Sequence, residues 1–582
     1  MVAAHSYGWF DLLRVALALT CLAACKRGQP AERLPAPAPG PAPVVAEVPQ
    51  TQGDAWQLGR LPPSVVEGTP VRGGTLVVGI DLDPESLNPI VSSDWIAKKI
   101  VHTRVYESLV RVDAHDDPRY AIVPQLAQRW EVSDDGRVYT FQLRHDVRWH
   151  DGTAFSARDV VATLDKVRDP HTLAASTRAD FEELSSYSAP DDFTVVLVWK
   201  RPYFLALDAV ADLPIQPAHV IAGLTAAHYN QAAKNPLNRA PLGTGPFKFV
   251  AWETGAKIAL ERNPTYWGRS AHLQHLVFRI VPDASARLQL AARGEIQLLY
   301  RLKADQWVNM SSPELRAHWH RSRFYAAKYN WIGWNERRSF FAELPVRRAM
   351  TMLIDRPGIL GKLLFGLHRS TTCHFYWASA ACDPKQSPLP YDPAAAAALL
   401  DASDIRDHDG DGVRDRDGER FAFKLVLHVN SSEAARSAAK IKEDLARAGI
   451  EMAIERVEWS AFLKRMAAHD FDATMLQWSG DARMDPTQIW HSHSIEGGSN
   501  FIGYRNPEVD GLIEQARVTL DSDARNKLYR RLGEILHAEQ PYTFLYVPAE
   551  LDLLHESVKG ARPNLYWWQF EELWLAPPSG GP

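Results

Sequence analysis

The sequence is poor in cysteine and lacks long basic or apolar runs. Only four of its 582 residues are cysteine, so we do not expect a fold held together by many disulfides. The 65 basic and 70 acidic residues are interspersed, and we therefore expect no nucleic-acid partner. Beyond residue 25 no apolar run reaches membrane length, which predicts that the rest of the chain is soluble.

Common enzyme motifs are also missing. The sequence contains no G-x-S-x-G nucleophile elbow, no GxxxxGK[ST] phosphate loop and no GxGxxG dinucleotide loop. Aspartate and glutamate are plentiful, so a hydrolase that uses two carboxylates is not excluded by composition. The chain is longer than one compact core usually allows, which predicts two or more domains.

The N-terminus has the pattern of an exported lipoprotein. Residues 15–24 (VALALTCLAA) are apolar but too short to span a bilayer. The run Leu22-Ala23-Ala24-Cys25 resembles a bacterial lipobox, which predicts a signal peptide over residues 1–25 and a lipid anchor on Cys25. The alternative is an ordinary secretory signal followed by an incidental cysteine.

Residues 26–70 are rich in proline and alanine. Such a segment favours extended polyproline II and cannot build a core, so we expect a linker that tethers the folded part to its anchor. An exported compartment is oxidising, and there Cys373 and Cys382 can close a short loop as a disulfide.

The folded part begins near residue 71 with strand and hairpin patterns. Residues 73–80 read as a strand, 130–144 as a hairpin turning at Asp135-Gly136, and 243–263 as two strands around a second turn. Residues 421–477 then alternate strand, helix, strand, helix and strand. That order predicts an α/β lobe with a mostly parallel sheet.

Asp481 follows the last of these strands (471–478), after Trp478, Ser479 and Gly480. In open α/β sheets, ligands bind beyond the carboxyl ends of the strands, so Asp481 is placed where a ligand would lie. The alternative is that Ser479 or Asp481 caps the helix that begins next.

Several blocks in the same order resemble bacterial extracellular solute-binding proteins of family 5. The blocks are PQLAQRWEVSDDGRVYTFQLRHDVRWHDGTAFSARDV (124–160), GTGPFKF with NPTYWG (243–268), WNERRSFFAELPVRRAMTMLIDR (334–356), WSGDARMDP (478–486) and SNFIGYRNPEVDGLI (499–513). The resemblance implies an α/β, periplasmic-binding-protein-like fold, with two α/β lobes enclosing a ligand cleft and an inserted third domain. The implied ranges are 71–108, 241–305 and 542–582 for domain I, 109–240 for domain II and 306–541 for domain III.

The resemblance also implies a function. In peptide-binding members the aspartate of the W-x-G-D segment pairs with the ligand's α-ammonium, which here is Asp481. The same likeness suggests that Trp478, Ser479, Gly480, Ser86, Leu87 and Asn88 lie at the ligand, with Arg483 as a candidate for its carboxylate.

We therefore expect a monomeric, non-enzymatic lipoprotein of the cell envelope, facing the periplasm or the exterior, that captures short peptides for the permease of an ABC importer. An exported hydrolase acting on peptides or glycans is the alternative. Within the receptor class, a metal chelate, haem, an opine or an oligosaccharide is another candidate ligand.

Two stretches carry metal-ligand residue types. Residues 407–420 (DHDGDGVRDRDGER) match the first half of a calcium-binding loop through Asp407, Asp409, Asp411 and Asp415, but position twelve is Gly418. An acidic surface hairpin explains the same residues without metal. His491 and His493 form a His-x-His pair with no visible further ligand, and we expect both to be solvated. No other cofactor is expected.

Overall fold

The computed structural model describes residues 61, 63–92, 94–562, 564–565 and 568–577. The predicted signal peptide, the lipidation site Cys25 and most of the predicted linker lie outside these residues. Within the described part of the chain, none of the helices combines the length and apolar character needed to cross a membrane.

A seven-stranded mixed sheet forms the core of the first lobe, here called the seven-stranded lobe. Its spatial order is β12-β21-β11-β1-β10-β9-β8. The strands are β1 (Thr75–Ile80), β8 (Phe247–Glu253), β9 (Lys257–Arg262), β10 (His275–Ile280), β11 (Leu298–Leu299), β12 (Trp319–Tyr325) and β21 (Ala549–His555). Its helices include α3 (Trp95–Val101), α9 (Ala284–Ala292), α10 (Ala304–Val308) and α11 (Pro313–His318).

An antiparallel sheet with the order β4-β5-β7-β6 is the core of the second, four-stranded lobe. Its strands are β4 (Ala127–Val132), β5 (Val138–Leu143), β6 (Leu184–Asp191) and β7 (Thr194–Trp199). Around it lie α4 (Ala157–Arg168), α5 (Ala175–Asp180), α6 (Ala206–Ala211), α7 (Ala218–Ile221), α8 (Ala226–Asn230) and the short pair β2 (Val110–Val112) and β3 (Ile122–Pro124).

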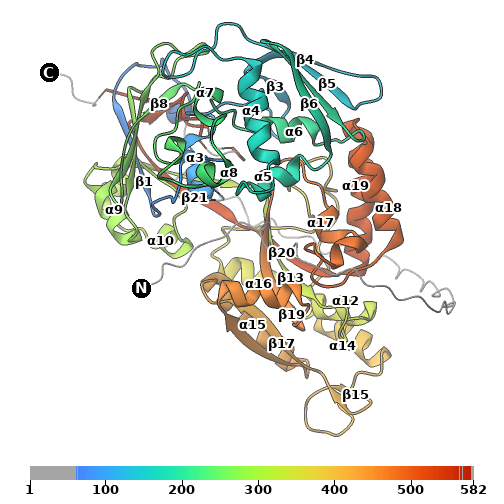
Figure 1. The fold of residues 1–582 in the computed structure, drawn as a ribbon. Coiled ribbons are helices and arrows are strands. Elements are labelled where there is room, and N and C mark those ends of the chain that lie inside the picture. Colours follow the sequence, from blue (N-terminus) through green and yellow to red (C-terminus); the bar gives the residue numbers. More distant parts are fainter. Residues whose placement is uncertain (1–60, 62, 93, 563, 566–567, 578–582) are drawn as a thin grey trace.

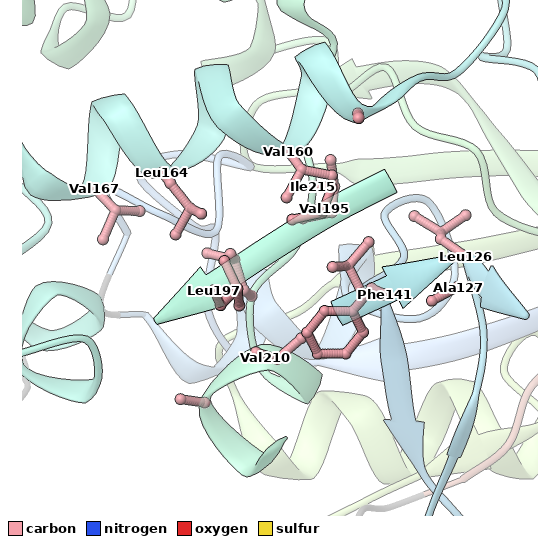
Figure 2. Close-up of a cluster of buried hydrophobic side chains, with 14 of the residues drawn as sticks. Leu126, Ala127, Phe141, Val160, Leu164, Val167, Val195, Leu197, Val210 and Ile215 are labelled. Carbon is pink, nitrogen blue, oxygen red and sulfur yellow. The ribbon is translucent and has the colours of Figure 1, made fainter. Parts of the chain in front are cut away.

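Helix α4 packs on this sheet through one apolar face. Val160, Leu164 and Val167 are spaced by four and three residues, so their side chains share one side of the helix. Figure 2 shows these side chains directed toward Val195 and Leu197 of β7, in the same buried cluster. The hairpin predicted over 130–144 is confirmed as β4 and β5.

The third, six-stranded lobe has the sheet order β14-β20-β13-β19-β17-β18. Its strands are β13 (Lys328–Trp334), β14 (Arg369–Ser370), β17 (Ala422–His428), β18 (Glu451–Val457), β19 (Ala473–Ser479) and β20 (Tyr542–Val547). Its main helices are α12 (Leu344–Met352), α14 (Pro393–Ala402), α15 (Ser432–Arg447), α16 (Trp459–Ala467), α18 (Pro507–Val518) and α19 (Ser522–Glu539).

The predicted strand–helix–strand–helix–strand order is confirmed in this lobe. Strand β17 pairs in parallel with both β18 and β19, as crossover helices require. Helix α15 ends before Gly449, whose φ of +73° suits the glycine expected just after a helix. Helices cover both faces of the sheet, which explains the near-continuous apolar character of its strands.

Strand pairing differs from the predicted domain ranges at two places. Strand β12, within the range predicted for domain III, pairs with β21 in the seven-stranded sheet. Strand β20, within the range predicted for domain I, pairs with β13 in the six-stranded sheet. The cause is the same in both cases: the chain passes from one sheet to the other between two successive strands, β12 to β13 and β20 to β21.

Figure 1 shows the arrangement of the three lobes. The six-stranded sheet with α12, α14 and α15 extends away from the body that holds β1, β8 and α4. Helices α18 and α19 lie beside the β4–β6 sheet. A Cβ placed on Gly136, in the β4–β5 turn, would lie 2.8 Å from Cδ1 of Leu520, between α18 and α19, so these two lobes are in direct contact.

Candidate functional site

One face of β19 emerges from the core and carries polar side chains. Ala473 and Met475 are buried, whereas Gln477, Ser479 and Asp481, which have the same parity along the strand, are exposed. Successive side chains in a strand point to opposite faces, so these three share one face. Ala473 and Met475 belong to a buried hydrophobic cluster of the six-stranded lobe, so this face is covered at the start of the strand and open at its end.

The neighbouring strand β13 extends this polar face. It runs antiparallel to β19, and Lys328 lies opposite Ser479 while Asn330 lies opposite Gln477. Directly opposite residues in antiparallel strands project from the same face. Lys328 also reaches the other sheet, because its Nζ lies 2.5 Å from Oε1 of Glu550 in β21.

Charged groups of the other two lobes surround Asp481. Burial raises the pKa of Asp481 to about 6, and the carboxylates of Asp212 and Asp208 in the four-stranded lobe act in the same direction. Lys99 and Lys98 of α3 act in the opposite direction. The side chain still reaches solvent, so its burial comes from the lobes that surround it rather than from direct cover. This explains how a strand-end carboxylate is both accessible and poorly hydrated.

No hydrogen bond or ion pair engages the Asp481 carboxylate among the residues that the structure describes. The helix-cap alternative is therefore wrong for Asp481. Helix α17 (Thr487–Trp490) follows this segment, and there Oδ1 of Asp485 accepts from the backbone N–H of Thr487 at 2.9 Å.

Lys99 and Asp180 complete the charged surroundings, and the sequence analysis identified neither. Burial lowers the pKa of Lys99 to about 8, and Asp481 and Glu550 act against that shift. Burial raises the pKa of Asp180, at the end of α5, to about 7, with Asp212 and Asp481 contributing. No local motif marks these residues, since they approach Asp481 only through packing of the lobes.

Of the residues predicted around Asp481, Trp478 and Gly480 contribute to packing and backbone structure. Trp478 is buried in the core of the six-stranded lobe, stacked on Trp331 with ring centroids 5.6 Å apart, so the expectation that it lines the cleft is wrong. The backbone N–H of Gly480 donates to the carbonyl of Ala327 at 2.8 Å, which holds the strand end beside the crossing to β12. Ser479 is exposed on the polar face.

The structure does not bring Ser86, Leu87 and Asn88 to Asp481. Leu87 and Asn88 are completely buried, Leu87 in the core of the seven-stranded lobe and Asn88 against Gln216. Ser86 lies 3.3 Å from Oδ1 of Asn238. These residues connect the loop after β1 to the four-stranded lobe. They were predicted to contact the ligand beside Asp481 instead.

Arg483 is engaged by protein groups. Its Nε donates to Oδ1 of Asp208 at 2.7 Å, and its Nη1 donates to the carbonyls of Arg119 and Tyr120 at 3.0 and 2.8 Å. It therefore joins the six-stranded lobe to the four-stranded lobe, in contrast to its predicted role as the partner of a ligand carboxylate.

The predicted disulfide is confirmed. The sulfur atoms of Cys373 and Cys382 are bonded, which closes a short loop beside β14 in the six-stranded lobe. This loop carries Tyr376 and Trp377 between its two cysteines.

The acidic loop over residues 407–420 has part of a calcium geometry. One carboxylate oxygen from each of Asp407, Asp409 and Asp415 lies within 4.8 Å of the others. Asp411 is paired with Arg420 instead, and the hairpin of β15 (Asp415–Arg416) and β16 (Glu419–Arg420) places no bidentate glutamate at position twelve. The ligand set fits calcium incompletely, and calcium binding stays a prediction.

The His-x-His pair differs from expectation at one position. His491 is buried, and its Nε2 lies 3.3 Å from Oε1 of Glu514, whereas His493 is exposed. The ring of His491 packs against α18 beside Asp510 and Glu514, which explains why it is buried.

Comparison with known proteins gives consistent results. The family described as "Bacterial extracellular solute-binding proteins, family 5 Middle" matches residues 121–500, more than half of the chain. The chain is similar to the "Oligopeptide-binding protein AppA" of Bacillus subtilis (strain 168), with 30% identity over 527 residues that cover 88% of this chain and 93% of that protein. It is also similar to the "Dipeptide-binding protein" of Escherichia coli (strain K12), with 26% identity over 524 residues that cover 84% of this chain and 92% of that protein.

A solved structure agrees with these relatives. The oligopeptide-binding protein AppA from Bacillus subtilis, in complex with a nonapeptide, has a TM-score of 0.71 and 28% identity, covering 88% of this chain and 100% of that one. The matched blocks, the three-lobed α/β architecture and these relatives agree in showing that the chain belongs to the bacterial extracellular solute-binding proteins of family 5.

Proposed function

We propose that this protein is the substrate-binding component of an ABC importer, and that it captures short peptides between its lobes and delivers them to a permease. The relatives are named as oligopeptide- and dipeptide-binding proteins, and a solved relative holds a nonapeptide. Asp481 is the single observation that carries the proposal: it is an accessible strand-end carboxylate beside charged groups of the other two lobes, and none of the described residues forms an ion pair with it.

The physical reason is the cost of a poorly hydrated carboxylate. Burial disfavours the charged form of Asp481, and an ammonium ion that arrives beside it restores a counter-charge. Contacts with groups of more than one lobe favour the closed arrangement by their differential affinity for it. Ser479 and Gly480 complete this candidate subsite for the first residue of the peptide.

The remaining expectations belong to the same proposal. The relatives are named as binding proteins, so we propose that this chain has no catalytic activity. We also propose that it acts as a monomer outside the cytoplasm, with a lipid on Cys25 as its anchor. A hydrolase acting on peptides or glycans would instead release products from purified protein, which chromatography of the incubated mixture would detect.

The test is calorimetric titration with short peptides and their N-acetylated forms. We expect acetylation to weaken binding at least tenfold, because it removes the ammonium charge. D481N should bind both forms equally, whereas D134N, a change at an exposed turn in the four-stranded lobe, should behave like the wild type. Equal affinities of the free and acetylated peptides for the wild-type protein would overturn the role of Asp481.

A further inference from the structure

A cavity of about 280 Å³ lies where all three lobes meet, apart from Asp481. The four-stranded lobe contributes the loop between β2 and β3, the seven-stranded lobe contributes the end of β12 with Arg562, Asn564 and Leu565, and the six-stranded lobe contributes the disulfide-closed loop. Five aromatic side chains line it: Tyr120, Phe324, Tyr325, Tyr376 and Trp377.

The aromatic walls are arranged before any ligand arrives. Tyr120 and Tyr376 meet edge to face at 5.8 Å between ring centroids, and Tyr325 and Trp377 meet in the same way at 5.9 Å. The hydroxyl of Tyr376 donates to Oδ1 of Asp117 at 3.0 Å, which links the six-stranded lobe to the four-stranded lobe at the cavity. Preorganised walls lower the entropic cost of binding.

The cavity also has a cation at its edge. Arg562 lines it and is exposed, and in the part of the chain described by the structure no carboxylate pairs with its guanidinium. Aromatic walls suit an aromatic ring, and a guanidinium suits a carboxylate. In a peptide, only the C-terminal residue carries a side chain and a free carboxylate on the same carbon.

We propose that this cavity binds the C-terminal residue of the peptide when that residue is aromatic, with its ring between the aromatic walls and its carboxylate on Arg562. The volume is sufficient, because a cavity on the order of 150 Å³ already holds benzene. The position also connects the cavity to Asp481: Ala482 is the next residue in the chain, and its side chain packs with Tyr120 and Tyr376. The inference rests on the proposed function and adds a preference for one class of peptide.

The experiment compares matched peptides of two to five residues that end in phenylalanine, in phenylalanine amide or in alanine. Calorimetric titration of the wild-type protein should show at least tenfold tighter binding of the phenylalanine peptide than of the alanine peptide, and tighter binding of the free acid than of the amide. R562Q should remove the difference between acid and amide and keep the preference for the ring. W377A should reduce that preference to less than about threefold.

Matched control variants distinguish loss of the cavity wall from misfolding of the protein. F365A removes an exposed aromatic side chain of the same lobe and should leave all ratios unchanged. W377F keeps an aromatic wall and should keep the preference, which guards against a W377A protein that folds poorly.

The outcomes distinguish this proposal from the proposed function. Equal binding of the phenylalanine and alanine peptides by the wild-type protein would overturn the cavity assignment while leaving peptide capture intact. If W377A weakened the binding of every peptide by the same factor, the cavity assignment would also be overturned. Failure of every peptide to bind would overturn peptide capture, and this inference with it.

Discussion

Arg483 in the six-stranded lobe and Asp208 in the four-stranded lobe form a half-buried ion pair, with Nη2 of the arginine 2.6 Å from Oδ1 of the aspartate. The same guanidinium also donates to two carbonyl groups of the β2–β3 loop. Phe204 strengthens this contact, because its backbone N–H donates to the carbonyl of Arg517 at 3.0 Å and its ring packs against Tyr529. One lobe thus holds the other close to Asp481.

Loss of this contact should weaken ligand binding. We expect R483M to raise the dissociation constant for a bound peptide about tenfold, because the change removes the ion pair and two hydrogen bonds that join the lobes beside Asp481. Calorimetry measures the affinity. The control is R531M, which breaks an exposed pair with Glu508 inside the six-stranded lobe and should have no effect. Equal affinities of R483M and R531M would show that this clamp does not influence binding.

Asp481 should make the ligand-free protein less stable at alkaline pH. Its pKa is raised to about 6 in the folded protein, above the ordinary value of 3.8, so folding favours the neutral form. The resulting stability is fully present below pH 3.8 and is lost as the pH rises through 6. D481N, which stays neutral, should therefore melt at a higher temperature than the wild type at pH 8, and the gap should shrink toward pH 4.

Thermal unfolding followed by circular dichroism at several pH values checks this expectation. D134N should show no pH-dependent gap, since Asp134 is exposed in a turn. A D481N protein that melts below the wild type at pH 8 would contradict the account of Asp481 as an uncompensated carboxylate. In the wild type, peptide affinity should also fall as the pH drops below about 6, because binding must then remove a proton.

Glu107 connects two of the sequence blocks that carry the family resemblance, 124–160 and 243–268. Its carboxylate accepts from the hydroxyl of Thr244 at 2.8 Å, the hydroxyl of Tyr266 at 2.7 Å, Nε1 of Trp267 at 2.9 Å and Nε2 of Gln125 at 3.2 Å. Burial nevertheless raises the pKa of Glu107 to about 7, against the effect of these donors. The site lies between the seven-stranded and four-stranded lobes.

We expect E107Q to destabilise the protein by roughly 2–4 kcal/mol. The new amide NH₂ replaces one acceptor oxygen, so in either orientation it faces a donor that cannot accept in return, the amide of Gln125 or the indole of Trp267. Urea denaturation measures the loss. E131Q, at an exposed position on β4, is the control and should change stability by less than about 0.5 kcal/mol. An unchanged midpoint for E107Q would mean that these bonds contribute little.

The acidic loop should bind calcium only weakly. Three carboxylates gather there, but the bidentate glutamate of a complete site is missing, so we expect half-saturation at or above about 1 mM. Thermal unfolding in a calcium titration measures the effect, and D409N should abolish it. An unchanged melting temperature at 10 mM calcium would identify the loop as an acidic hairpin without a metal.

The prediction of local structure succeeded where one segment carried its own pattern. The period-two alternation of Tyr139 and Phe141 predicted a strand, and the Asp135-Gly136 pair predicted its turn. The strand and helix order over residues 421–477 predicted a parallel sheet, and β17 pairs in parallel with β18 and β19. These predictions depend on patterns of residues that are close in the sequence.

The prediction of residue environments failed where packing between lobes decides. Trp478 was expected in the cleft, but helices cover its face of β19 as far as that residue, and its ring joins the core. Leu87 and Asn88 were expected at the ligand, but the four-stranded lobe covers the loop after β1. The local sequence pattern does not predict the burial of these residues, because it depends on which distant segments of the chain pack against them.

By itself the sequence determined that a carboxylate follows the end of β19, because the strand pattern and the residues just after it are local properties. Only the tertiary structure decided what surrounds that carboxylate: Lys98 and Lys99 of α3, and Asp180, Asp208 and Asp212 of the four-stranded lobe. The physical reason is that charge interactions act through space, and the spacing of these groups is set by how three separate cores pack together.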